Sequence, residues 1–198
     1  MMVMSGGKEG FMNSTFAMIA ISFTIIIIGV VLSMYLARRK RSERLQEHFG
    51  PEYERTVQSL GDEEKAQAEL VERQKHVSAL DIRPLTDAER ERYQTDWTAV
   101  QSDFVDEPGQ AIVEADHLIM EVMQLRAYPV SDFEQRAADV SVSYPTLVSH
   151  YRAAREIALK NTQQQASTED LRQAMIYYRS LFAELVGTET NHLVEKQP

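Results

Sequence analysis

The chain has 198 residues, no cysteine and a formal net charge of −9 at pH 7. The lack of cysteine excludes a disulfide framework and leaves the compartment open, because a reducing and an oxidising compartment both tolerate a cysteine-free protein. Four consecutive basic residues occupy positions 38–41, so the rest of the chain is more acidic than the total. An acidic surface repels phosphate backbones, which argues against nucleic-acid binding by the folded part.

An uncharged apolar run covers Phe16 to Ala37 and ends at Arg38, Arg39, Lys40 and Arg41. As a helix with a rise of 1.5 Å per residue, this run would be roughly 33 Å long, which matches a hydrocarbon core of about 30 Å. The sequence therefore predicts a single transmembrane helix, with the four basic side chains in contact with lipid headgroups. By the positive-inside rule, the N-terminus lies outside the plasma membrane and the C-terminal domain lies in the cytoplasm.

A cleaved signal peptide, which would export the domain, is the main alternative. Such a peptide places its positive charge before a shorter apolar core and a small-residue cleavage site after it. Here the positive cluster follows the core, which favours an uncleaved anchor. Within the run, Gly29 and Ser33 form a small-xxx-small pair that suits a homodimer through the span, although one such pair is common by chance.

After residues 38–41, here called the basic collar, the positions of Gly, Pro and helix-capping residues predict helices and no strand. Gly50-Pro51 interrupts a helical segment, and a further helix is expected from Asp62 to Leu80. Thr86 to Glu89 and Ser131 to Glu134 have the form of capping boxes, the second of which opens a short helix to about Val142. Ser167 or Thr168 caps the last helix, and Gly187 ends it. The longer helices are predicted at 86–105, 108–127, 145–161 and 168–186.

No segment alternates with the period of two that a strand requires. Tyr93, Trp97, Val100 and Phe104 recur at spacings of four, three and four, which is typical of the buried face of a helix. The predicted fold is all-α: a single N-terminal transmembrane helix followed by a helical bundle around Trp97. The expected parts are a short tail (1–15), the span (16–37), a basic collar with a juxtamembrane helix (38–61), an acidic helical domain (62–187) and a frayed tail (188–198).

Several strings give the domain a recognisable signature, namely RSERLQEHFGPEYERTV, IRPLT, FVDEP, YPVSDFEQRAADVSVSYP and STEDLRQAMIYYRSLF, together with the spacing of Arg92-Tyr93 and Trp97. They resemble a family of uncharacterised bacterial proteins described only as membrane or secreted. The resemblance covers about residues 42–186. It implies no activity, cofactor or site residue, and its secreted description conflicts with a cytoplasmic domain.

Motifs for catalysis or metal binding are weak. Glu114 and His117 have the Glu-x-x-His spacing of di-iron carboxylate bundles, and Glu189 and His192 repeat it, but two such pairs are no surprise in a chain rich in Glu. No Gly-x-Ser-x-Gly elbow or glycine-rich phosphate loop occurs, and the neighbouring Ser149 and His150 would face different directions on a helix. We therefore expect no cofactor and no catalytic or metal site.

Asp132, Glu134 and Arg136 form the most distinctive polar cluster. We expect them to pair with one another, or with Arg83 and Arg126, in a partly buried network; the alternative is a recognition surface. An anchored acidic domain is best suited to binding a membrane-proximal partner protein, so an interaction or scaffold role is predicted. The alternative is an enzyme, or a domain binding a small molecule or metal, whose site is assembled from scattered helix positions.

Overall fold

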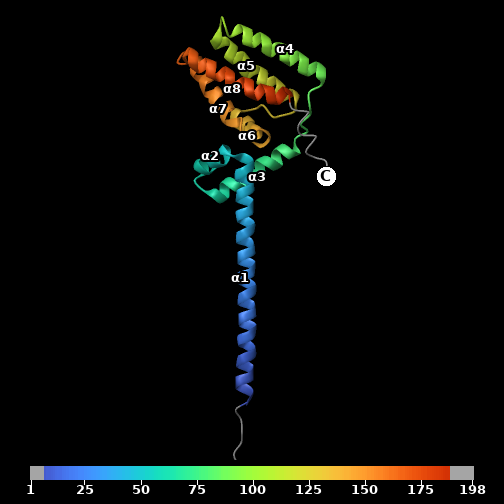
Figure 1. The fold of residues 1–198 in the computed structure, drawn as a ribbon, viewed down its shortest axis with the longest axis vertical. Coiled ribbons are helices and arrows are strands. Elements are labelled where there is room, and N and C mark those ends of the chain that lie inside the picture. The colour runs from blue at the N-terminus through green and yellow to red at the C-terminus, as the bar shows by residue number, and fades with distance from the viewer. Residues whose placement is uncertain (1–6, 188–198) are drawn as a thin grey trace, which may run out of the picture. The chain divides into compact units, whose positions relative to one another are not determined.

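The computed structural model describes the backbone of residues 7–187, with the side chains of residue 23 and of residues 26–187. This part of the chain forms eight α-helices and no strand, which confirms the predicted all-α class (Figure 1). The helices are α1 (Gly7–Phe49), α2 (Pro51–Leu60), α3 (Glu63–Ala79), α4 (Asp87–Asp103), α5 (Pro108–Leu125), α6 (Phe133–Ser143), α7 (Val148–Thr162) and α8 (Thr168–Gly187).

Helix α1 is continuous, so the predicted span and the segment after the basic collar belong to one helix. Among the described residues, no helix carries a stretch both long and apolar enough to cross a membrane, and the predicted transmembrane helix finds no support there. Of that predicted span, the side chains at 16–22, 24 and 25 lie outside the described residues. Of the short tail expected at 1–15, residues 1–6 lie outside the described residues, whereas 7–15 belong to α1, so the helix starts before the predicted span. The tail expected at 188–198 lies outside the described residues too.

The chain divides into two compact units, the second of which starts at Leu45 rather than at the expected residue 62. The earlier start arises because α2 and α3 form a small core with the end of α1. The buried apolar side chains of this core are Leu45, Phe49, Tyr53 and Leu70. Gly50, at φ 49°, and Pro51, at the start of α2, make the predicted break.

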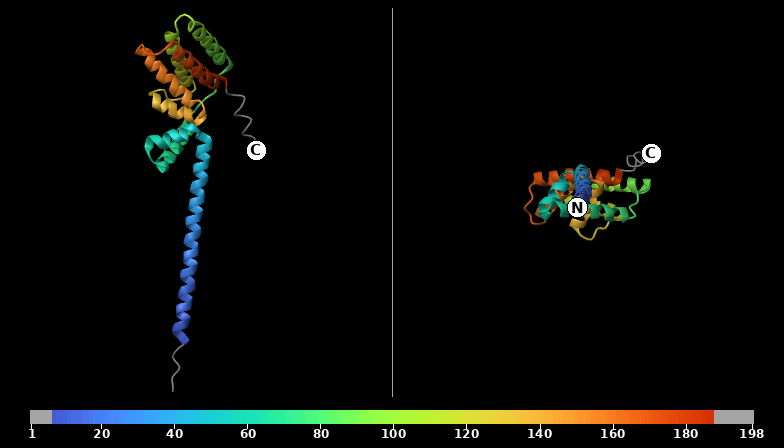
Figure 2. Two further views of the ribbon diagram at one scale, coloured as in Figure 1. Left: turned by 60° about the vertical axis from the view of Figure 1, so that its left-hand side comes forward. Right: turned by 90° about the horizontal axis from the view of Figure 1, so that it is seen from below.

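The main core of the second unit lies between α4, α5, α6, α7 and α8. Helix α8 packs against both α5 and α7, and α4 packs against α5, as the two views in Figure 2 also show. Trp97 is buried as predicted, and its ring stacks on Phe182 with centroids 4.5 Å apart. It does not lie at the centre, however. The large side chains of this core that are almost completely buried belong to α5, α6, α7 and α8: Ile112, Ile119, Val122, Met123, Val140, Tyr151, Tyr178, Leu181 and Leu185.

The helices start close to the predicted positions, except that α6 and α7 each start later than predicted. Thr86 and Glu89 form a reciprocal capping box, as expected. Ser131 does not cap α6; the carboxylate of Asp132 accepts the Gln135 backbone N–H at 3.0 Å, so the helix starts one residue later. Helix α7 begins at Val148 instead of 145, because the backbone turns from Tyr144 to Leu147 first.

The cap of α8 is Ser167. Its hydroxyl accepts the backbone N–H of Asp170 at 3.1 Å, while the Asp170 carboxylate accepts the backbone N–H of Ser167 at 2.9 Å. This reciprocal pair satisfies two amides that the helix itself leaves without a partner. Of the two predicted capping residues of the last helix, Ser167 and Thr168, Ser167 is therefore the one that caps it.

Candidate functional site

The three polar residues predicted to form a network on α6 each bind a different partner. Asp132 caps the helix, as described above. Glu134 accepts a hydrogen bond from Arg152 at 2.6 Å. Arg136 is buried and donates to the Tyr151 hydroxyl at 3.2 Å and to the Val130 carbonyl at 2.8 Å.

Neither Arg83 nor Arg126 takes part in that arrangement. Arg83 forms a bidentate ion pair with Glu89: its two terminal guanidinium nitrogens donate to the two carboxylate oxygens at 2.9 and 2.8 Å. Arg126 donates to the Leu185 carbonyl at 2.8 Å and to the Tyr144 hydroxyl at 3.2 Å. The predicted pairing of these two arginines with Asp132, Glu134 or Arg136 is therefore wrong. Arg83 pairs with Glu89 instead, and Arg126 donates to groups of Tyr144 and Leu185.

Glu52 is the first of three buried carboxylates that sequence reasoning missed. Its side chain is 2% exposed, and its Oε1 accepts hydrogen bonds from Arg73 at 3.1 Å and from Arg152 at 3.2 Å. Arg55 adds a longer ion pair at 3.6 Å. One carboxylate thus joins α2 to α3 and α7. The signal was the spacing of Tyr53 and Thr56, which marks a buried face of α2 next to Glu52.

Asp139 forms a second buried carboxylate, between α6 and α3. Its Oδ1 accepts a hydrogen bond from Gln135 at 2.8 Å and lies 3.6 Å from Nε2 of His76. Its Oδ2 has no hydrogen-bond partner among the described residues. Burial raises the pKa of the Asp139 carboxyl, and the Gln135 hydrogen bond and the charges of His76 and Arg73 only partly oppose this effect.

This raised pKa predicts how Asp139→Asn should behave. The neutral carboxyl is favoured in the fold, so its contribution to stability is present below its ordinary pKa of 3.8 and is lost as the pH rises through the folded value. Urea unfolding between pH 4 and pH 7, monitored by circular dichroism, should show a smaller loss of stability in the variant than in the wild-type chain. A steeper loss in the variant would mean that His76 and Arg73 stabilise the charged form.

A third buried carboxylate, Asp116, joins α5 to α7 and α8. It accepts hydrogen bonds from Arg155 at 2.9 Å and from the Tyr178 hydroxyl at 3.1 Å. Burial, together with the nearby Asp116 charge, raises the pKa of Tyr178 well above its usual range. The hydroxyl therefore stays protonated and serves as a hydrogen-bond donor between helices.

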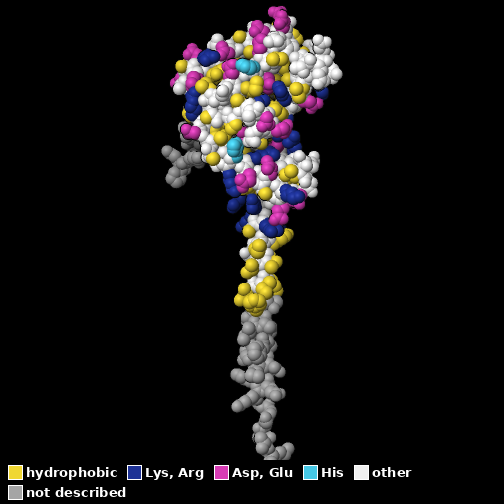
Figure 3. Space-filling view, turned by 180° about the vertical axis from the view of Figure 1, so that it is seen from behind, with side chains coloured by type: hydrophobic (Ala, Val, Ile, Leu, Met, Phe, Trp, Pro, Cys, Tyr) yellow, Lys and Arg dark blue, Asp and Glu magenta, His cyan; other side chains and the backbone are white. Residues whose placement is uncertain are grey.

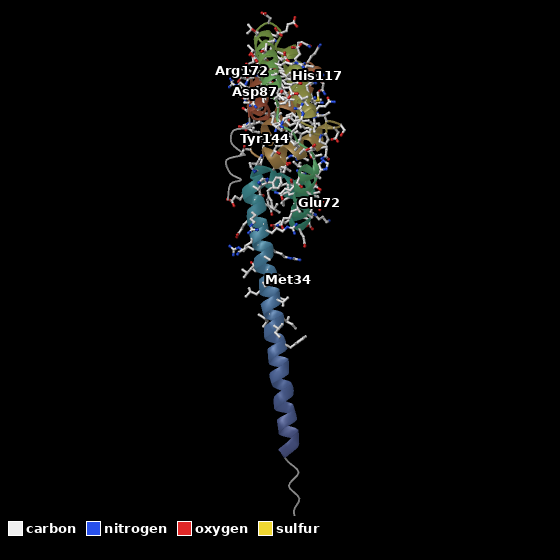
Figure 4. The ribbon with its side chains drawn as sticks, turned by 90° about the vertical axis from the view of Figure 1, so that its right-hand side faces the viewer. Met34, Glu72, Asp87, His117, Tyr144 and Arg172 are labelled. Carbon is white, nitrogen blue, oxygen red and sulfur yellow. The ribbon has the colours of Figure 1, made fainter. Side chains whose placement is uncertain are left out.

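The metal candidates Glu114 and His117 line an open groove of about 520 Å³ between α4 and α5. His117, labelled in Figure 4, is exposed and pairs through Nδ1 with Glu121 at 3.1 Å. Glu114 accepts a hydrogen bond from Gln110 at 3.0 Å. No three His, Asp or Glu side chains in the described part of the chain are grouped as metal ligands would be. The second pair, Glu189 and His192, lies outside the described residues.

The predicted lipid-contacting residues Arg38, Arg39, Lys40 and Arg41 are all exposed on α1. Arg39 forms an ion pair with Glu43 one turn later, at 2.9 Å. Figure 3 shows hydrophobic side chains along the described part of α1 and basic side chains next to them. The described helix therefore presents an apolar surface that adjoins a positively charged one.

Comparison with protein-family models, with curated proteins and with solved structures finds no match for this chain. The resemblance to a bacterial membrane or secreted family stays a prediction.

Proposed function

We propose that the chain is a single-pass membrane protein, anchored through Phe16–Ala37, whose helical domain binds a partner protein close to the membrane. Residues 38–41 then contact anionic headgroups, and the domain lies in the cytoplasm. The single observation that carries the proposal is the apolar surface of α1.

Between Phe23 and Leu36, the described large apolar side chains of α1 are 48% to 65% exposed. They are Phe23, Ile26, Ile27, Ile28, Val30, Val31, Leu32, Met34, Tyr35 and Leu36. Successive residues are turned by about 100° in an α-helix, so these side chains cover every side of it. Soluble proteins rarely expose a continuous apolar surface of this kind, whereas a lipid bilayer covers it completely.

A binding role suits the domain because its buried charged groups hold helices together. Glu52, Asp116 and Arg136 each pair with side chains or carbonyls of neighbouring elements. The surface, by contrast, carries the acidic excess of the chain. Such a field steers a positively charged partner towards the domain and makes the association rate fall as salt increases.

The anchor is tested by membrane extraction of the full-length protein. A charged residue at the centre of a span costs about 2.5–3.5 kcal/mol. The double variant Ile27→Lys, Val31→Lys should therefore move a large share of the protein from the carbonate-resistant membrane pellet to the supernatant. Leu159→Lys is the control, because Leu159 is about as exposed as Ile27 but lies on α7. Equal extraction of the wild-type chain and the double variant would reject the anchor.

The partner is tested by cross-linking the full-length protein in native membranes. We expect one or more reproducible protein adducts, whose yield falls when exposed carboxylates of the domain are replaced by lysine. Adducts that are insensitive to such charge reversal and to salt would contradict the proposed role of the acidic surface.

A further inference from the structure

The groove between α4 and α5 is the described surface whose shape and charge best define an occupant. Its floor is apolar and consists of Val100, Val113 and Leu118. Val113 is 44% exposed and lies between the exposed Gln110 and His117 on the groove face of α5, whereas Val100 and Leu118 are buried. The groove residues of α5 extend from Gln110 to Glu121, or about three helical turns.

The rim of the groove is acidic. Asp96, Glu114 and Glu121 supply three carboxylates, against the guanidinium of Arg92 and the imidazole of His117. Arg92 lies 3.6 Å from Asp96, and His117 pairs with Glu121. The hydrogen bond to Glu114 comes from Gln110, which is neutral. The rim therefore has a negative excess.

We propose that this groove binds an amphipathic helix of a partner protein, with an apolar seam on Val113 and basic side chains on either flank. The groove runs between two helices, so a third helix can pack along it and cover the apolar floor. The basic flanks complement the rim carboxylates. An open groove with three exposed turns fits a helix better than it fits a small molecule, which needs a cleft that encloses most of its surface.

This inference rests on the proposed protein-binding function and names the kind of partner. It also assigns roles to the residues. Val113 provides the central apolar contact, and Glu114 and Glu121 select positive charge. Their side chains line the same groove about two turns apart on α5.

The test uses the full-length protein in nanodiscs of zwitterionic lipid, so that basic peptides do not bind the membrane itself. Two fluorescein-labelled helical peptides share one leucine seam and differ only in Lys or Glu on the flanks. Fluorescence anisotropy should show binding of the Lys peptide that weakens with salt, and binding of the Glu peptide that is at least about tenfold weaker.

Two variants locate the binding to the groove. Val113→Gln adds no charge and should weaken Lys-peptide binding about tenfold, whereas Leu159→Gln, at a similarly exposed position on α7, should leave it unchanged. The double variant Glu114→Lys, Glu121→Lys should reverse the preference between the two peptides. Unchanged circular dichroism would show that each variant is folded.

Three results would overturn the inference: no binding of the Lys peptide, equal binding of both peptides, or equal effects of the Val113 and Leu159 variants. Its failure is distinguishable from failure of the proposed function. If the groove is not the site, salt-sensitive adducts in membranes persist in Val113→Gln. If the domain has no protein partner, such adducts are absent even where the Lys peptide binds the groove.

Discussion

Replacing Glu52 by alanine is expected to lower the free energy of unfolding by about 3–5 kcal/mol, because two mostly buried guanidinium groups lose the buried carboxylate that they share. Glu52 is almost completely buried, and Arg73 and Arg152 both donate to the same oxygen. Without it, Arg152 keeps only its exposed partner Glu134, and Arg73 keeps Glu69. Urea unfolding of the full-length protein in detergent, monitored by circular dichroism, measures the effect.

Glu134→Ala is the matched control for this substitution. Glu134 pairs with the same Arg152, but its side chain is 69% exposed. Exposed ion pairs contribute about 0–1 kcal/mol, so this variant should be nearly as stable as the wild-type chain. Similar losses for the two variants would mean that Glu52 is solvated and that α2 and α3 are not held to α7 through its carboxylate.

The second large effect is expected for Trp97→Ala, which should cost about 3–5 kcal/mol of unfolding free energy. The indole is buried and stacks on Phe182 of α8, so its removal opens a cavity between α4 and α8. The control is Val105→Ala, since Val105 is 82% exposed in the turn after α4. Chemical unfolding by circular dichroism compares both variants with the wild-type chain.

Fluorescence provides an independent check, because Trp97 is the single tryptophan of the chain. A buried indole is shielded from acrylamide, so quenching should be weak in the folded protein and strong in urea. Strong quenching under native conditions would place Trp97 at the surface and contradict the packing of α4 on α8.

Local signals were enough to predict the helices. Capping chemistry and Gly or Pro punctuation act over three or four residues, and they located the starts of α2, α4 and α5 to within a residue. The error at α6 arose because Ser131 and Asp132 are adjacent and both residue types can cap a helix. The Asp132 carboxylate, and not the Ser131 hydroxyl, accepts the Gln135 backbone N–H. Apolar spacing likewise identified the buried face of α4, where Tyr93, Trp97 and Val100 are buried.

Polar contacts between residues far apart in the sequence could not be predicted in this way. Glu52 and Arg152 are 100 positions apart, and no periodic pattern links them. A lone glutamate at the start of a helix is ordinarily a favourable interaction with the helix dipole, which concealed its burial. The same argument applies to Asp139, where burial depends on how α3 docks onto α6. The sequence also did not predict the groove between α4 and α5, although the candidate metal ligands Glu114 and His117 both line it.

The most direct measurement for the proposed anchor is cysteine accessibility in intact cells. The chain has no native cysteine, so single substitutions at Ser5 and at the exposed Gln165 give unambiguous sites for an impermeant thiol reagent. An anchor with its basic collar in the cytoplasm predicts labelling at Ser5 in intact cells, and at Gln165 only after the cells are opened. Labelling of Gln165 but not Ser5 in intact cells would contradict a cytoplasmic domain anchored by Phe16–Ala37.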